Sequence, residues 1–358
     1  MKSPSSQAPV FYSEKAYVEL NKYISKANHS ALFILVDSNT HQNCLSRFLQ
    51  RLETNNSFEI IEMDAGEESK NIETCSGIWS TLSELGADRK SLLINLGGGV
   101  VTDLGGFVAS TFKRGIAFIN VPTTLLSMVD ASVGGKTGVD LGNLKNQIGV
   151  ITQPEMVLID SKYLNSLPSN EMRSGLAEIL KHGLITSETY WEKTTSLHKL
   201  TTEDLDGLIS ESVSIKTNVV QRDPREENQR KTLNFGHTFG HAIESYFLTH
   251  PEKPKLLHGE AVAIGMIMAT FISTKISDFP EEKLTSISKK ILDIFPKVDL
   301  KESDFEKILD LLKFDKKNTH GNINFVLLKD IGQPLIDYRV PENLLLEALA
   351  FYRGIQKS

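Results

Sequence analysis

The sequence predicts two parts: an α/β domain over residues 1–168 and an all-α domain over residues 169–358. In the first part, short apolar runs alternate with helical patterns, which favours a parallel sheet covered by helices. In the second part, apolar residues recur every three or four positions, which is typical of packed helices. The chain has 358 residues and 40% of them are hydrophobic, so each part can bury a core of its own.

Five short apolar runs are expected to be the strands of the sheet. They are residues 31–36, 58–63, 92–96, 116–121 and 156–159. Helical patterns follow the first two runs, at residues 41–52 and 66–85, and Leu167-Pro168 closes the domain. Beyond that point the helical spacing is clearest at residues 176–185, 205–213 and 262–271.

The third run ends in Gly97-Gly98-Gly99, and an apolar helical pattern resumes at Asp103. Glycines let the backbone approach a ligand closely, and the free N–H groups at a helix start bind phosphate. This turn predicts a Rossmann-like nucleotide-binding domain, although Thr102 stands where the strict G-x-G-x-x-G pattern has its third glycine. VGGKTG imitates a P-loop but has Asp130 in place of the first glycine. On these residues alone, a glycine-rich turn without a ligand is the alternative.

Polar side chains stand at the ends of the first two predicted strands. Asp37 and Asn39 follow the first, and Glu67 and Lys70 follow the second. Ligands of open α/β sheets bind at the carboxyl ends of strands, so these residues are candidates for the ribose and adenine side of a nucleotide. Helix caps and solvated turn residues would leave the same pattern.

Composition and charge exclude several classes of protein. The net charge of −6 and the pI near 5.9 argue against a nucleic acid partner. The start of the chain has no basic and apolar leader pattern, and no run reaches the roughly 18 apolar residues of a membrane span, so we expect a cytoplasmic protein without a membrane partner. Cys44 and Cys75 are far apart and are expected to be reduced structural thiols.

Three histidines and one glutamate form a candidate metal site. His237 and His241 are four residues apart and share a helix face, while His258 opens another helical segment. Glu178 lies in an apolar helical stretch, where a buried carboxylate needs a cation. One Glu and two His would leave an open position on Zn²⁺, as in catalytic sites. The spacing does not decide which two histidines bind.

Cationic and amide side chains are abundant in or beside glycine-rich and apolar stretches. Such donors suit a small polyanion, with arginine favoured for bidentate contact to carboxylate or phosphate. Solvation at the surface is the alternative; it fits Lys181 and Lys136 poorly and Lys216 well. The candidates are Lys136, Lys145, Asn146, Lys181, Lys216, Arg230 and Asn234.

Six motifs in order, GGGVVTDLGGF, VPTTLLSMVDASVGGKTGVD, LKNQIG, SGLAEILKHGLI, RKTLNFGHTFGHAIE and LHGEAVAIGM, closely resemble the 3-dehydroquinate synthases of the sugar phosphate cyclase family. The resemblance implies a dehydroquinate synthase-like fold, with a Rossmann-like domain and a helical domain. It also implies the conversion of 3-deoxy-D-arabino-heptulosonate 7-phosphate to 3-dehydroquinate and phosphate. That reaction uses NAD, which is regenerated in each turnover, and Zn²⁺ or Co²⁺.

The resemblance also implies roles for individual residues. The metal ligands would be Glu178, His237 and His258, with His241 facing the substrate and His182 in place of the family's usual tyrosine. The residues holding NAD would be Asp37, Asn39, Glu67, Lys70, Gly98, Gly99, Val100, Asp103, Thr123, Thr124, Leu126, Asp130 and Lys145. Those around the sugar phosphate would be Asp130, Lys136, Lys145, Asn146, Lys181, Lys216, Arg230, Asn234, His241 and either Lys316 or Lys317.

The resemblance further implies a homodimer in which Arg114, in a polar turn before the fourth predicted strand, reaches the substrate phosphate of the neighbouring subunit. Three other interpretations stand against this one. A metal-dependent polyol dehydrogenase would share the metal ligands but would have no use for an anion clamp. Another sugar phosphate cyclase would not need Arg230 for a substrate carboxylate. A non-catalytic NAD-binding protein should have lost ligands, and none is missing from the sequence.

Overall fold

The computed structural model describes residues 7–142, 144–196, 202–313 and 323–356. The chain divides into two compact units. The first comprises Met1–Pro168 together with Thr202–Val213, and the second comprises Ser169–Thr201 and Ser214–Ser358. Helix α8 (Thr202–Arg222) contributes its first part to one unit and its last part to the other.

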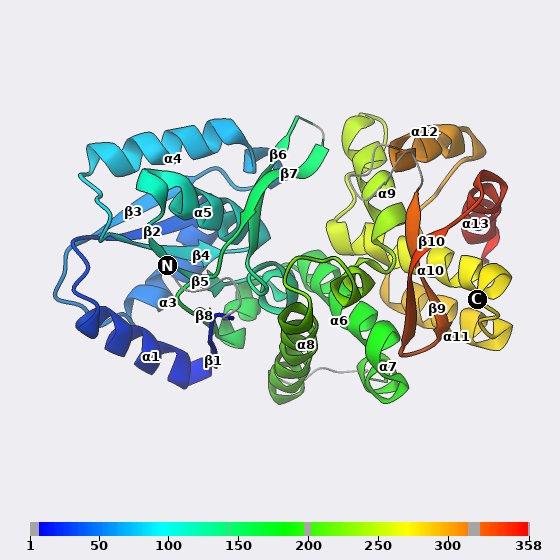
Figure 1. Cartoon of the computed structure of the whole chain (residues 1–358), viewed down its shortest axis with the longest axis horizontal. Coiled ribbons are helices and arrows are strands. Elements are labelled where there is room, and N and C mark those ends of the chain that lie inside the picture. Colours follow the sequence, from blue (N-terminus) through cyan, green and yellow to red (C-terminus); the bar gives the residue numbers. More distant parts are fainter. Residues whose placement is uncertain (1–6, 143, 197–201, 314–322, 357–358) are drawn as a thin grey trace. The chain divides into compact units, whose positions relative to one another are not determined.

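The first unit is built on a six-stranded parallel sheet with the order β1-β8-β5-β4-β2-β3. Strands β2 and β4 are buried along their whole length, which explains their uninterrupted apolar sequences. Figure 1 shows α4 (Ile72–Glu84) and α5 (Gly99–Thr111) on one side of the strands, and α1 (Ser13–Lys26) and α3 (Ser46–Leu49) on the other. The strands are β1 (Val10–Tyr12), β2 (Leu32–Asp37), β3 (Phe58–Met63), β4 (Leu92–Gly97), β5 (Ala117–Pro122) and β8 (Val157–Ile159).

The five predicted strands are therefore confirmed, and β1 is an addition of three residues. The predicted helices are shorter than expected. The segment 41–52 is divided into α2 (Ser38–Thr40), a π-helical turn (His41–Leu45) and α3. The segment 66–85 contains a 3₁₀ turn (Glu67–Ser69) before α4, because Asn71 caps that helix through a bond from Thr74 N to its Oδ1.

The strand order reverses direction at the centre of the sheet. From β2 the chain moves outward to β3, returns to β4 on the other side of β2, and continues to β5 and β8. Ligands of open α/β sheets bind at the carboxyl ends of the two strands where this reversal occurs. Those ends are Asp37 on β2 and Gly97 on β4, which the sequence marked as candidate nucleotide-binding positions.

An antiparallel hairpin, which the sequence analysis did not predict, follows strand β5 along the chain. It consists of β6 (Lys136–Leu141) and β7 (Leu144–Ile151). A Cβ on Gly106 of α5 would lie 2.5 Å from Thr137 Cγ2, so the small residue is what lets β6 approach that helix.

The second unit is mainly helical. Its helices are α6 (Ser169–Thr186), α7 (Glu188–Thr195), α9 (His237–Thr249), α10 (His258–Ile276), α11 (Glu281–Ile294), α12 (Glu302–Lys313) and α13 (Glu342–Gly354), with a 3₁₀ turn at Gln229–Asn234. It also contains an antiparallel pair, β9 (Asn324–Asp330) and β10 (Gln333–Arg339), that the expectation of helices alone had missed. Ser273 Oγ of α10 accepts a hydrogen bond from Leu328 N of this pair at 2.9 Å.

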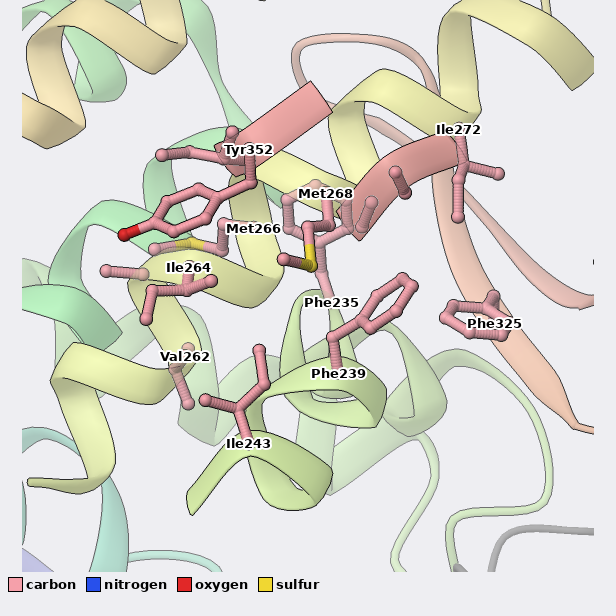
Figure 2. Packing of buried hydrophobic residues seen from close by; sticks show 14 of the residues in the cluster. Phe235, Phe239, Ile243, Val262, Ile264, Met266, Met268, Ile272, Phe325 and Tyr352 are labelled. Carbon is pink, nitrogen blue, oxygen red and sulfur yellow. The ribbon is translucent and has the colours of Figure 1, made fainter. Parts of the chain in front are cut away.

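Helix α10 lies at the centre of this unit's core. It is long and apolar enough to cross a membrane by composition, but 72% of its most apolar window is buried, as in the core helix of a globular fold. Figure 2 shows its side chains among those of neighbouring elements, and the rings of Phe239 and Phe325 lie 5.3 Å apart. The labelled residues are Phe235, Phe239, Ile243, Val262, Ile264, Met266, Met268, Ile272, Phe325 and Tyr352.

Helices α9 and α10 approach each other through glycines. A Cβ on Gly265 would lie 1.9 Å from the carbonyl oxygen of Gly236, and a Cβ on Gly240 would lie 3.1 Å from Val262 Cα. Gly236 has a φ of 78°, a left-handed conformation that glycine adopts without strain, and it directly precedes His237. This contact therefore sets the position of the first histidine of α9.

Candidate active site

Glu178 is the centre of a polar cluster inside the second unit. Its side chain is fully buried on α6, and Lys181, one turn later, donates to its Oε2. Burial opposes ionisation, but the Lys181 ammonium and His237 hold the pKa of Glu178 well below its usual range. Within the described residues, no hydrogen bond reaches its other oxygen, Oε1. A buried carboxylate oxygen without a donor calls for a cation.

Two histidines present their Nε2 atoms to that oxygen. His237 Nε2 lies 3.3 Å and His258 Nε2 lies 3.6 Å from Glu178 Oε1. The opposite nitrogens are held elsewhere, since His237 Nδ1 contacts Phe235 O at 3.2 Å and His258 Nδ1 contacts Glu244 Oε2 at 3.2 Å. If each Nδ1 carries the proton of its hydrogen bond, both Nε2 lone pairs face a carboxylate oxygen. That arrangement fits a divalent metal bound by one carboxylate and two imidazoles.

The acid–base properties of the pair agree with a cation site. Burial and the nearby Lys181 ammonium lower the pKa of His237 to about 4, which keeps this ring neutral. Burial also opposes the protonation of His258, but the neighbouring Glu178 and Glu244 carboxylates raise its pKa to about 10. A proton on His258 therefore stands in for a cation, and metal binding would release it.

The structure distinguishes among the three histidines that the sequence left open. Glu178, His237 and His258 have one ligand atom each within 4.8 Å of one another. The ring of His241 lies beside them, 5.3 Å from the ring of His237 and 5.8 Å from that of His258. His182 is fully buried on the same helix as Glu178.

Glu244 is a residue of this site that the sequence analysis missed. It follows His237 by seven residues and His241 by three, so all three belong to one face of α9. This spacing, which places a carboxylate on the same helix face as two histidines, is the signal in the sequence that could have identified Glu244.

The predicted nucleotide residues of the first unit gather at the ends of β2, β4 and β5. Helix α5 starts at Gly99 with no side chain capping it, so its first N–H groups are available to an anion. A Cβ on Gly98 would lie 3.0 Å from Thr124 Cγ2, which leaves little room for a side chain there. Thr123 is buried, and its N–H donates to Gly97 O at 2.9 Å. Val100, which follows Gly99, and Leu126, two residues after Thr124, are both half-buried.

A second group of predicted residues forms one charged network. Lys70 Nζ donates to Asp103 Oδ2 at 2.6 Å and to Asn146 Oδ1 at 2.7 Å. Lys145 Nζ donates to Glu67 Oε1 at 2.6 Å. The network joins the β6–β7 hairpin to the residues after β3 and to α5, so the fold brings together candidates for the nucleotide and for the sugar phosphate. Asp140 also belongs to it, since its Oδ1 accepts from Asn146 N at 2.6 Å, and the sequence analysis did not single it out.

Asp37 and Asn39 illustrate how a predicted ligand residue can also have a structural role. Asp37 Oδ1 accepts from Thr40 N at 2.7 Å and caps the short helix α2, which was the alternative considered for it. Asn39 is exposed in that helix.

Among the remaining candidate donors, two lysines differ in solvent exposure from what their sequence context indicated. Lys216 is buried, although a solvated position had fitted it well, and Lys136 is exposed, although a solvated position had fitted it poorly. Arg230 is buried, and its NH1 donates to Pro224 O at 2.8 Å. Asn234 Nδ2 donates to Glu226 Oε1 at 2.7 Å.

Four further candidates complete the predicted set. Asp130 is half-buried, and Arg114 is exposed in a turn before β5. Lys316 and Lys317 lie outside the described residues.

Comparison with known proteins identifies the family. The model of the 3-dehydroquinate synthase N-terminal domain matches residues 60–174, and that of the C-terminal domain matches residues 175–318. A 3-dehydroquinate synthase of Parabacteroides distasonis is 42% identical over 339 residues, which cover 94% of this chain and 95% of that protein. The chain belongs to the 3-dehydroquinate synthase family. It is therefore an enzyme, and the predicted fold class is confirmed.

Solved structures of sugar phosphate cyclases share the fold. A 2-deoxy-scyllo-inosose synthase complexed with carbaglucose-6-phosphate, NAD⁺ and Co²⁺ is 26% identical, with a TM-score of 0.83 and 95% of each chain covered. A 2-epi-5-epi-valiolone synthase from Streptomyces hygroscopicus with NAD⁺ and Zn²⁺ bound is 24% identical, with a TM-score of 0.84 and 98% of each chain covered.

Replacing Glu244 by Gln in this member of the 3-dehydroquinate synthase family is expected to weaken Zn²⁺ binding about 10- to 100-fold, because His258 loses the carboxylate that holds its Nδ1 proton. Competition with a chromophoric chelator measures the Zn²⁺ affinity directly. Glu252→Gln, at an exposed position after α9, is the matched control. Unchanged Zn²⁺ affinity in Glu244→Gln would show that Glu244 does not orient His258.

Proposed function

We propose that this enzyme converts 3-deoxy-D-arabino-heptulosonate 7-phosphate to 3-dehydroquinate and phosphate, using NAD and Zn²⁺ or Co²⁺. It is a phosphorus–oxygen lyase of the shikimate pathway, which leads to chorismate and the aromatic amino acids. One observation carries the proposal beyond family membership: a buried carboxylate oxygen of Glu178 faces two histidine Nε2 atoms without a hydrogen bond. That donor set suits a catalytic metal.

In this proposal the second unit binds the metal. Glu178, His237 and His258 hold the ion, which when bound polarises a substrate hydroxyl and lowers its pKa. Lys181 balances the charge of Glu178 and keeps it ionised as a ligand. His241, whose ring lies beside both metal histidines, is placed to exchange protons with the substrate.

The anionic groups of the substrate need cationic donors. Arg230, which is buried and held through its main-chain N–H by Asp223 Oδ2 at 2.9 Å, is assigned to the carboxylate. Lys136, Lys145, Asn146, Lys216, Asn234, Asp130 and one of Lys316 and Lys317 complete the set around the sugar phosphate. This anion clamp distinguishes the proposed reaction from that of a polyol dehydrogenase.

The first unit, with residues 1–168 as its predicted extent, binds NAD. When bound, NAD accepts a hydride from a substrate carbinol carbon and returns it to the same carbon. Gly98 and Gly99 with the uncapped start of α5 hold its pyrophosphate, and Val100, Asp103, Thr123, Thr124 and Leu126 line the neighbouring strand ends. Asp37, Asn39, Glu67 and Lys70 serve its ribose and adenine side, with Asp130 and Lys145 nearer the nicotinamide side.

An assay of phosphate release separates this proposal from its rivals. With the heptulosonate phosphate as substrate, NAD⁺ is expected to accelerate phosphate release without net accumulation of NADH, because oxidation and reduction occur at one carbon. Absorbance at the NADH band during turnover is the measurement. Stoichiometric NADH would favour a polyol dehydrogenase, and faster turnover of a carboxylate-free sugar phosphate would favour another cyclase.

We further propose a homodimer in which Arg114 contacts the substrate phosphate of the partner subunit. Its turn supports this assignment, since Lys113, Arg114 and Gly115 have φ values of 48°, 71° and 110° in succession. Left-handed backbone at two residues other than glycine is costly and concentrates at functional sites. The turn is closed by bonds from Gly115 N to Phe112 O at 2.8 Å and from Arg89 Nε to Lys113 O at 3.2 Å, and it leaves Arg114 exposed.

Mixing two inactive variants tests a shared site. If Arg114 acts across the interface, dissociating and reassociating Arg114→Ala with Glu178→Gln gives heterodimers with one intact site each. Random mixing should then restore about a quarter of the wild-type activity, as two-fold symmetry requires. Heterodimers that form but show no activity would place Arg114 in its own subunit's site or outside any site.

A further inference from the structure

A second candidate binding site lies in the second unit, away from the residues assigned above. A cavity of about 580 Å³ is bounded by the end of α11, the segment after it and the end of α13. Cavities of this size hold small organic ligands in many proteins. None of the predicted metal, nucleotide or substrate residues lines it.

Half of the residues that line the cavity are apolar, and part of this apolar wall is firmly held. Leu292, Phe295 and Phe351 are among its lining residues. The Phe351 ring stacks on Phe271 at 4.6 Å with an angle of 20° between the planes. The last turn of α13 is fixed by Lys297, whose Nζ donates to Arg353 O at 2.7 Å. The wall is thus ready to receive an apolar ring without rearrangement.

Two polar atoms in this lining have no partner among the described residues. They are Arg173 Nε, from the first turns of α6, and Ser288 Oγ, from α11. Ser288 is only 4% exposed, so solvent does not replace the missing hydrogen bond. A buried donor without a partner is costly, and a bound acceptor would offset that cost.

The charges around the cavity indicate which kind of acceptor group a ligand would carry. Arg173 and Lys289 are cationic and Asp293 is anionic, which leaves a single positive charge at the cavity. A guanidinium binds a carboxylate through two parallel hydrogen bonds. A phosphate dianion would be left partly uncompensated, and the hydroxyl-rich substrate would place polar groups against apolar walls.

We propose that this cavity binds a small aromatic monocarboxylate. The carboxylate accepts from Arg173 and Ser288, and the ring lies among Leu292, Phe295 and Phe351. The ligand class follows from one guanidinium, one serine hydroxyl and an apolar wall, and it does not depend on the proposed reaction.

Binding of 3-(4-fluorophenyl)propanoate, followed by ¹⁹F NMR with the whole metal-loaded protein, tests the site. We expect saturable binding that is about tenfold weaker or more in Arg173→Met, as for the loss of a hydrogen bond to a charged group. Ser288→Ala is expected to weaken it about fivefold, and Ala is well tolerated in a helix. Arg339→Met, at an exposed position of β10 outside the cavity, is the matched control.

Four results would overturn the proposal. The corresponding carboxamide could bind equally well, which would reduce the cavity to an apolar cleft. Both Arg173→Met and Ser288→Ala could keep the parent affinity with an unchanged melting temperature. The heptulosonate phosphate could displace the probe competitively, or no binding could be detected at millimolar probe concentration. Either result would rule out a separate site for aromatic carboxylates in this cavity.

Discussion

Glu178→Gln is expected to remove tight Zn²⁺ binding and to destabilise the metal-free protein by about 3–5 kcal/mol. The amide keeps the shape of the side chain but removes the charge that Lys181 balances. Because Lys181 is only 1% exposed, its ammonium would be left buried without a counterion. Removing one partner of a buried ion pair has a cost of this size.

Zn²⁺ competition and urea unfolding of the metal-free protein measure the two effects separately. Glu192→Gln, an exposed position on α7, controls for the loss of a carboxylate. The Lys181→Met, Glu178→Gln double variant should recover part of the stability, since no buried charge remains, but should not recover Zn²⁺ affinity. Parent-like Zn²⁺ affinity in Glu178→Gln would rule out this metal site.

Gly265→Ala is expected to destabilise the second unit by about 3 kcal/mol and to weaken metal binding at the same time. The added Cβ would lie 1.9 Å from Gly236 O and 2.9 Å from Gly240 N, which are main-chain atoms that cannot move alone. Helix propensity alone would favour Ala by about 1 kcal/mol, so the steric effect opposes the intrinsic one. Moving Gly236 also moves His237, the next residue.

Thermal unfolding and Zn²⁺ affinity of the same samples test both effects. Gly77→Ala on α4 is the matched control, because no neighbouring atom lies within 4 Å of its added Cβ. That variant should be as stable as the parent or slightly more stable. If Gly265→Ala loses stability but keeps full Zn²⁺ affinity, α10 packing does not position His237.

The sequence by itself determined the parallel sheet. Its central strands are buried on both faces, so their residues must be apolar without interruption, and the runs at 92–96 and 31–36 show this directly. It also pointed to Gly97–Gly99 as a strand end, because three glycines cannot continue a buried strand. The chemical types of Glu178 and of the histidines indicated a metal, since a carboxylate in an apolar helix needs compensation.

Only the tertiary structure decided which atoms meet. His237 and His241 are equivalent by helical spacing, and the choice between them depends on where α6 and α10 pass α9. Glu244 became visible because its carboxylate contacts His258, 14 residues away along the chain. The two hairpins escaped prediction because their strands are defined by tertiary contacts. In each hairpin the two strands pair with one another and pack on a helix, α5 for β6–β7 and α10 for β9–β10, and local periodicity does not encode these contacts. Sequence patterns report which side chains must be buried, whereas the partner of each buried group is decided by packing between distant segments.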